Sequence, residues 1–151
     1  MPIRNHIQAI VGLLDDKSSF AYGTVAELNR LADAQTFPCV FLFPYPAIEL
    51  ATAINGSIDN TFTVYLEFLF QTSFDQFTAD NEIYVSRALQ LANEFLIKAA
   101  QYRPQPNGSR FFKIKAGTKA KCMPVYNKYD ANTTGVSLAL VLETMSFDVV
   151  H

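Results

Sequence analysis

Lysine is the residue type whose spacing in this chain points most directly to binding chemistry. Four lysines fall within residues 110–122, on either side of the Ala116-Gly117-Thr118 triplet: Lys113, Lys115, Lys119 and Lys121. Because successive side chains of a strand point to opposite faces, a spacing of two places both lysines of each pair on one face. A hairpin turning at the glycine would gather the four ammonium groups as a contact for phosphate or for an acidic protein surface.

The same lysine hairpin has a purely structural explanation, because lysine commonly protects the exposed edge of a sheet. For a binding role, an acidic protein is favoured over nucleic acid, since bases need aromatic stacking partners and the nearby Phe111 and Phe112 are predicted to lie in the core. The formal net charge of -2 also argues against nucleic-acid binding through bulk electrostatics. The four lysines are therefore a candidate protein-interaction patch, and we predict no sequence-specific binding of nucleic acid.

The histidines and cysteines are not arranged as a catalytic or metal-binding site. His6 and His151 lie at opposite ends of the chain with no carboxylate or cysteine at ligand spacing, so both are predicted to be ordinary surface residues. Cys39 and Cys122 each lie in an apolar or strand-like run, which predicts reduced, buried and inert thiols. No metal site is predicted.

Two carboxylates, Glu67 and Glu143, are predicted to lie on the polar faces of strands that could be neighbours. Exposed cross-strand charges that face Lys or Arg are the commoner explanation of such a pair. A phosphate-binding loop is excluded because Gly117 is followed by Thr118, without the Gly-Lys-Ser/Thr order that such a loop requires. We predict no catalytic residue, no cofactor and a protein that is not an enzyme.

Length and composition bound the class of protein. At 151 residues the chain is expected to form a single domain, 1–151, with one core. Half of its residues are hydrophobic, 13 are phenylalanine and only 17% are charged, so we expect some apolar surface to face partner subunits. Neither a leader peptide nor a membrane span is recognisable, which predicts a soluble protein that is intracellular when made and has no membrane partner.

Hydrophobic periodicity predicts the elements that would position these residues. Apolar spacing favours helices over residues 3–14 and 24–34, the second capped by Thr24 with Glu27 completing a capping box, and a long helix over 81–102. Strands are predicted at 37–44, 47–54 and 61–71, with the Asn55-Gly56 loop closing a hairpin. The order predicts an α+β fold: a mixed or antiparallel sheet of about five strands with two main helices packed on it.

The last predicted strand follows a turn over Asp130 to Gly135, in which Asn, Asp and Gly supply the positive φ of a reversal. Its even positions from Val136 to Leu142 are all large and aliphatic, which indicates one buried face. We expect that face to pack with residues 62–70 beneath the long helix, making this strand central to the sheet.

This order of elements resembles the tail terminator and tail-completion proteins of tailed bacteriophages. The residues that carry the resemblance are Phe37-Pro38 at the first strand, residues 60–71 before the long helix, and Tyr129-Asp130 through Thr134-Gly135-Val136 ahead of the last strand. The resemblance implies a structural virion protein that forms a homomeric ring, expected to be a hexamer, at the head-proximal end of the tail. The family has no motif of shared chemistry, so no functional residue is transferred.

The resemblance also implies partners and a location. The ring would cap polymerisation of the tail tube, contacting the tube or an adjacent tail ring protein, and would join the tail to a head-side connector or neck protein. DNA could pass through its lumen, and the subunit, made in the host cytoplasm, would reside in the virion tail or neck. Two alternatives stay open: a neck or ring protein of a short-tailed phage, and a soluble α+β ligand-binding or adaptor domain with a closed apolar pocket.

We predict that reversing the four patch lysines, Lys113, Lys115, Lys119 and Lys121, to glutamate weakens attachment to an acidic neighbour while leaving the fold intact. The reason is that the reversal changes surface charge and removes no core side chain. Cosedimentation with tail tubes and circular dichroism measure the two effects. Unchanged binding by the quadruple variant would remove the interaction role of the patch.

Overall fold

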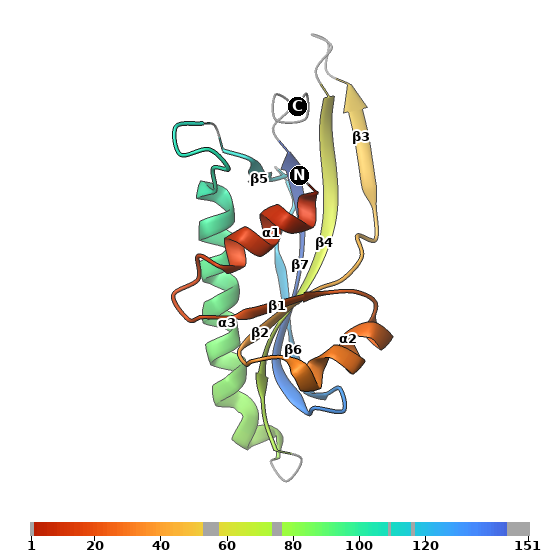
Figure 1. The fold of residues 1–151 in the computed structure, drawn as a ribbon, viewed down its shortest axis with the longest axis vertical. Helices are drawn as coiled ribbons and strands as arrows, with labels where there is room; N and C mark the ends of the chain where they lie inside the picture. Colours follow the sequence, from red (N-terminus) through yellow and green to blue (C-terminus); the bar gives the residue numbers. More distant parts are fainter. Residues whose placement is uncertain (1, 53–57, 74–76, 109, 116, 145–151) are drawn as a thin grey trace.

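Two long antiparallel strands, β4 (Ile58–Gln71) and β7 (Thr133–Thr144), lie side by side in the middle of a mixed sheet (Figure 1). The computed structural model describes residues 2–52, 58–73, 77–108, 110–115 and 117–144. Within these residues the sheet has seven strands, in the order β1-β2-β4-β7-β5, with β3 also paired to β4 and β6 also paired to β7. The α+β class is therefore confirmed, with a larger sheet than the predicted five strands.

Each long strand carries two short strands along its outer edge. Next to β4 lie β2 (Cys39–Leu42) and β3 (Ile48–Thr52), and next to β7 lie β5 (Phe112–Ile114) and β6 (Lys121–Lys128). All four are antiparallel to the strand they join, whereas β1 (Ser19–Tyr22) is parallel to β2. The parallel pair is what makes the sheet mixed, and β1 was not predicted.

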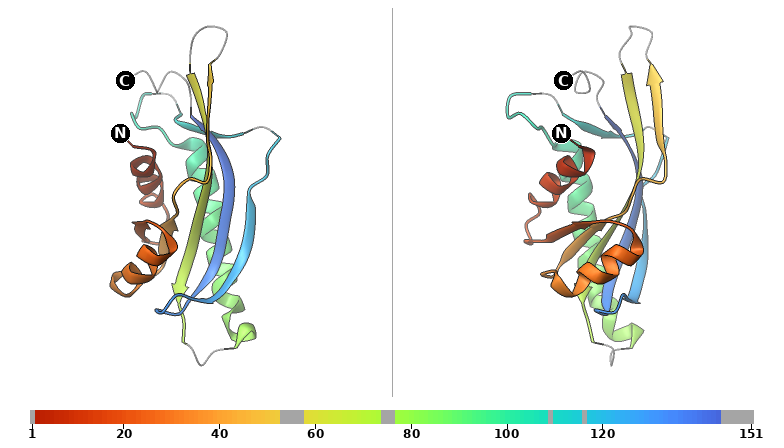
Figure 2. Two further views of the ribbon diagram at one scale, coloured as in Figure 1. Left: turned by 90° about the vertical axis from the view of Figure 1, so that its right-hand side faces the viewer. Right: turned by 45° about the vertical axis from the view of Figure 1, so that its right-hand side comes forward.

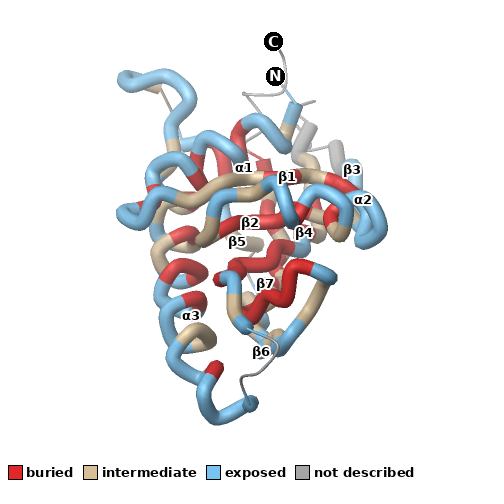
Figure 3. Tube along the Cα trace, turned by 60° about the horizontal axis from the view of Figure 1, so that its bottom comes forward, coloured by how far each residue is buried: buried red, intermediate tan, exposed pale blue. Residues whose placement is uncertain are grey.

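One face of the sheet is covered by α1 (Ile3–Val11) and the long helix α3 (Thr78–Gln101), and the main core lies between them and the sheet. Figure 3 shows the buried positions along β2, β4 and β7 and on the side of α3 that faces them. The register explains this core, because Phe62, Val64, Leu66 and Phe68 lie opposite the aliphatic even positions of β7. The predicted packing of the last strand is confirmed.

A second, smaller core lies on the opposite face at one end of the sheet. It is formed where α2 (Val25–Leu31) and a 3-10 turn (Ala32–Ala34) meet β1, β2 and β4, with Phe41 and Leu69 among its buried members. Thr24 caps α2 by accepting a hydrogen bond from the Glu27 amide, as predicted. Among the described residues no helix covers the rest of this face, and Figure 2 shows no helix beside β6. We call this uncovered part the open face.

The long helix starts earlier than its periodicity predicted, at Thr78. Asp80 lies within the first turn, where its carboxylate accepts a hydrogen bond from the Phe77 amide at 3.0 Å. Deeper in the helix, Phe95 meets Phe68 of β4 edge to face at 5.8 Å between ring centroids. This contact fixes the middle of α3 against the centre of the sheet.

The lysine hairpin prediction is wrong. The two segments expected to pair with each other, β5 and β6, both pair with β7, one after the other along the same edge. The ladder continues from β5 to the Lys115 amide, which donates to the Val141 carbonyl, and resumes at Lys121 opposite Ala139. Residues 117–120 leave the sheet edge, because more residues separate the two strands than the partner strand can pair.

Gly135 lies inside β7 and not in the turn that was predicted to need it. A Cβ atom placed on Gly135 would lie 1.8 Å from the Phe68 carbonyl oxygen, far closer than atoms can approach. The positive backbone angles of the turn belong to Asn127, Tyr129 and Asn132 instead. Glycine is required here because the backbones of β4 and β7 come too close for any side chain.

We predict that Gly135→Ala lowers the free energy of unfolding by about 3 kcal/mol or more, because β4 and β7 must separate locally to admit the methyl group. Urea denaturation followed by circular dichroism measures the change. Gly12→Ala is the matched control, since Gly12 is exposed at the end of α1 with an ordinary helical φ of -64°, and it should change stability by less than about 1 kcal/mol. Equal effects of both substitutions would contradict the close-approach explanation.

Candidate functional site

The predicted patch lysines do not face one another across a hairpin: Lys113, Lys115 and Lys121 follow one another along the same edge of β7, at Glu143, Val141 and Ala139. Lys113 lies opposite Glu143 in the register and its ammonium is 3.1 Å from that carboxylate, while Lys115 reaches Glu49 of β3 at 3.8 Å. Lys119, in the loop between β5 and β6, and Lys121 are exposed. Two of the lysines are therefore occupied by acidic partners within the chain, and the interaction role of the patch stays a prediction.

The most developed polar site is built around Glu67, on the face of the sheet opposite α1 and α3. Its carboxylate is almost fully buried, accepts a hydrogen bond from the Lys128 ammonium at 2.8 Å and accepts a second, short one from the Tyr129 hydroxyl. The predicted explanation, an exposed cross-strand charge, is wrong for Glu67 because Phe41 and Ser137 flank it on the neighbouring strands. Its opposite charge comes from Lys128, the last residue of β6.

A surface hollow of about 340 Å³ opens beside this carboxylate. Its walls come from the segment after β2, from β4, from the turn and from β7: Phe43, Pro44, Pro46, Tyr65, Leu66, Glu67, Lys128 and Ser137. The Lys128 ammonium lies 5.5 Å from the centre of the Phe43 ring and 5.0 Å from that of Tyr129, within range of cation–π attraction. The hollow thus combines an aromatic and proline-rich rim with an ion pair at its base.

Burial is the main reason that the pKa of the Tyr129 phenol is raised well above its ordinary value. The hydrogen bond to Glu67 and the negative charge of that carboxylate act in the same direction, because both favour the protonated phenol. Tyr129 therefore remains a hydrogen-bond donor at neutral pH. With both oxygens of Glu67 occupied by Lys128 and Tyr129, the three groups satisfy one another and hold the turn against β4.

The turn that presents Lys128 and Tyr129 is held in a backbone conformation that costs energy. Asn127, Tyr129 and Asn132 have φ angles of 48°, 65° and 53°, a region that side chains other than glycine adopt rarely. Side-chain hydrogen bonds tie it to three other elements, joining Asp130 to Asn29, Asn127 to Asn81 and Asn132 to the Thr72 carbonyl. The asparagines predicted a turn, but only the fold shows what they bind.

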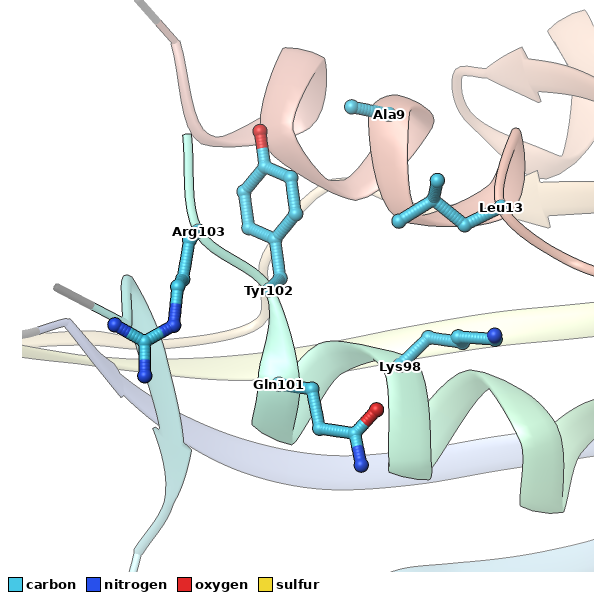
Figure 4. A pocket seen from close by; sticks show the side chains of 6 residues that line it. All are labelled: Ala9, Leu13, Lys98, Gln101, Tyr102 and Arg103. Carbon is cyan, nitrogen blue, oxygen red and sulfur yellow. The ribbon is translucent and has the colours of Figure 1, made fainter. Parts of the chain in front are cut away.

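A second hollow, of about 390 Å³, lies between α1 and the C-terminal end of α3 (Figure 4). Tyr102 stands toward α1, whereas Gln101 and Arg103 point away from that helix. Arg103 donates a hydrogen bond to the Gly108 carbonyl at 2.6 Å, so its guanidinium holds the following loop. The walls otherwise consist of Ala9, Leu13 and Lys98, and they present no set of converging polar groups.

His6 is buried, so its prediction as a surface residue is wrong. Its ring stacks on Phe111 with 4.0 Å between centroids, and its Nδ1 atom lies 3.1 Å from the Tyr102 hydroxyl. The apolar face of α1 carries it into the main core, where ring stacking and the polar contact with Tyr102 help to compensate for its burial. His151, the other predicted surface histidine, lies outside the described residues.

Both cysteines are free thiols, and their surroundings keep them protonated. Burial raises the pKa of Cys39 to about 12, and burial also raises the pKa of Cys122. Cys39 is fully buried as predicted, whereas Cys122 is partly exposed. Because the thiolate is the reactive form, neither side chain is suited to nucleophilic chemistry at neutral pH.

The two glutamates considered as a carboxylate pair are on neighbouring strands but far apart. Glu67 lies opposite Ser137 and Glu143 lies opposite Thr61, six residues further along β7, which corresponds to about 20 Å. Glu143 instead pairs with Lys113, as the cross-strand explanation predicted. Among the described residues, no three His, Cys, Asp or Glu side chains are grouped so that they could hold a metal ion.

Comparison with known proteins assigns this chain to no family. No protein-family model matches the sequence, and no curated protein matches it. In the part of the chain that the structure describes, no helix combines the length and the apolarity needed to cross a membrane.

We predict that Glu67 and Lys128 are coupled by about 1–2 kcal/mol in a double-mutant cycle of Glu67→Gln and Lys128→Met, because the carboxylate is buried and charge-assisted hydrogen bonds are strong. Urea denaturation of the four proteins measures this coupling. The matched control is the cycle of Glu143→Gln and Lys113→Met, whose lysine side chain is 58% exposed, so its coupling should stay below about 0.5 kcal/mol. Equal coupling in both cycles would contradict a structural role for the Glu67 cluster.

Proposed function

We propose that this chain is a structural virion subunit of the tail-terminator or tail-completion kind, which assembles with copies of itself into a ring at the head-proximal end of a phage tail. In this role it caps the tail tube and contacts a head-side connector or neck protein. The observation that carries the proposal is the projecting end of the sheet, where β3 and the adjoining part of β4 extend beyond the helices (Figures 1 and 2).

The projecting strands carry apolar side chains that no part of the same subunit covers. Ile48 is 52% exposed and Leu50 is 75% exposed, although the register places them opposite Phe62 and Asn60 on the same sheet face as the main core. They remain uncovered because α1 and α3 do not extend over this end of the sheet. Full burial of a leucine contributes roughly 1.5–3 kcal/mol, so a second copy that covers these side chains would be stabilised appreciably.

The phage tail and the ring enter this proposal through the resemblance of the sequence to tail terminators. The structure adds reasons for self-association. A further support for a structural role is the Glu67 cluster, whose three polar groups bind one another and anchor a turn. Low charge and high aromatic content agree with a subunit that buries part of its surface against neighbours. These features favour an assembly subunit over an enzyme.

We predict that the purified protein forms a defined oligomer and that the double variant Ile48→Ser, Leu50→Ser is monomeric with an unchanged circular dichroism spectrum. The serines remove the apolar surface that association would bury. Light scattering coupled to size-exclusion chromatography gives the mass, and electron microscopy with isolated tail tubes tests end capping. Leu13→Ser is the matched control, because Leu13 is 51% exposed just after α1 and does not belong to the projecting strands, and this variant should remain oligomeric.

A wild-type protein that stays monomeric, both alone and with tail tubes, would contradict the proposed function. In that case a ligand-dependent rise in melting temperature would favour the soluble binding or adaptor domain. An oligomer that binds a neck component of a short-tailed phage but not tail tubes would favour the short-tailed alternative.

A further inference from the structure

Next to the projecting end, the sheet is a four-stranded ladder with β3 at one edge and β5 at the other. In one row across it lie Glu49 of β3, Thr61 of β4, Glu143 of β7 and Lys113 of β5. The outermost strands are β3 and β5, and neither has a second strand partner among the described residues. Unpaired edges of this kind are templates for pairing with another chain.

The strand directions allow the ladder to continue into another copy of the chain. Each neighbouring pair in the order β3-β4-β7-β5 is antiparallel, so β3 and β7 run one way and β4 and β5 run the other. If neighbouring copies are related by rotation about an axis along the strands, β3 of the next copy runs opposite to β5. The new pair is then antiparallel, which continues the alternation within the subunit.

The backbone groups on the two edges also match. The Thr63 amide donates to the Ala47 carbonyl, and the Lys115 amide donates to the Val141 carbonyl. Because hydrogen-bonded and non-hydrogen-bonded residues alternate along an antiparallel strand, the free amides and carbonyls on the outer edges are those of Ile48 and Leu50 on β3 and of Phe112 and Ile114 on β5. Each edge thus offers two residues ready to exchange hydrogen bonds.

The side chains on these edges are complementary. The β3 edge reads Ile48-Glu49-Leu50 and the β5 edge reads Phe112-Lys113-Ile114, so each has one charged residue between two apolar ones. With Ile48 opposite Ile114 and Leu50 opposite Phe112, Glu49 falls opposite Lys113 in the closely spaced, non-hydrogen-bonded position. On the helix-side face the exposed Ile48 and Leu50 then gain apolar neighbours.

We propose that copies of this protein join edge to edge, with β3 of one subunit pairing antiparallel to β5 of the next and Glu49 facing Lys113 of that neighbour. This inference rests on the proposed self-association and names its interface. The two edges differ, so the contact is heterologous and each subunit has one acidic and one basic side. Repetition of such a contact yields a closed ring when the rotation between subunits closes, and continues the sheet around the ring.

Charge substitution tests the pairing. Glu49→Lys and Lys113→Glu each place like charges opposite one another at every contact, so each should raise the dissociation constant of the assembly about tenfold or more. The double variant E49K/K113E exchanges the two charges and should restore assembly. An equimolar mixture of the two single variants should also assemble, because every contact between unlike subunits again joins opposite charges.

The matched control is Lys17→Glu, which reverses an exposed lysine between α1 and β1, outside both strand edges and outside the lysine patch. It should assemble like the wild type. The ion pairs of Lys113 with Glu143 and Lys115 with Glu49 are partly exposed, so the single variants should retain the subunit fold. Circular dichroism and the melting temperature of each variant verify this.

Engineered cysteines provide an independent measurement. Within one subunit β4 and β7 separate Glu49 from Lys113, so their Cα atoms lie about 14 Å apart and cannot be joined by a disulfide. In the proposed pair the Cα atoms of neighbouring copies are about 4.5 Å apart, which permits one. Oxidised E49C/K113C protein should therefore run as a ladder of covalent oligomers on a denaturing gel, whereas E49C/K121C should not.

The outcomes separate this interface from the proposed function. If the wild type assembles but neither charge variant weakens assembly and no covalent ladder forms, the edge-to-edge pairing is wrong while the proposed function stands. If the wild type does not associate with itself or with tail tubes, both are wrong. Rescue by the exchanged double variant together with the ladder would support the pairing.

Discussion

The close antiparallel approach of β4 and β7 is the constraint on which the remaining structure depends. Their backbones are so near at Gly135 that no side chain fits there, and their register extends from Thr61 opposite Glu143 to Gln71 opposite Thr133. This register decides which residues of both strands face α3 and which face away. A slip of one position would expose the aliphatic row and bury the polar one, so the core and the open face are specified together.

The helices do not cover the whole length of β4 and β7, and the two ends of the sheet therefore differ. At one end α2 closes a small second core, with the buried Glu67 at its border and the β6–β7 turn tied down around it. At the other end the sheet continues past α1 and α3, leaving Ile48 and Leu50 exposed. At the first end the polar groups around Glu67 bind one another, whereas at the second end apolar side chains stay exposed. We therefore place self-association at the projecting end.

Charge is distributed in a way that suits directional assembly more than catalysis. The acidic Glu49 and the basic Lys113 lie on opposite edges of one row, and each also has a partly exposed ion pair within the chain, Glu49 with Lys115 and Lys113 with Glu143. The lysines that first suggested a binding surface are therefore divided between pairing within the chain and the free edge of the sheet. Cooperation of apolar and charged residues at an edge gives both affinity and orientation.

The sequence by itself determined the α+β class, the amphipathic long helix, the Thr24 cap and the buried even face of β7. Each of these depends on local hydrophobic periodicity or, for the cap, on a residue three positions further along the chain. The sequence did not reveal β1, the separation of β5 from β6, the burial of His6 or the Glu67 cluster. Those features depend on contacts between segments that are distant in the sequence. For example, β5 pairs with β7 and not with β6, its expected hairpin partner. Only the tertiary structure decided that pairing. The free energy of pairing two distant strands comes from the contacts between them, and neither strand carries a periodic pattern in its own sequence that identifies its partner.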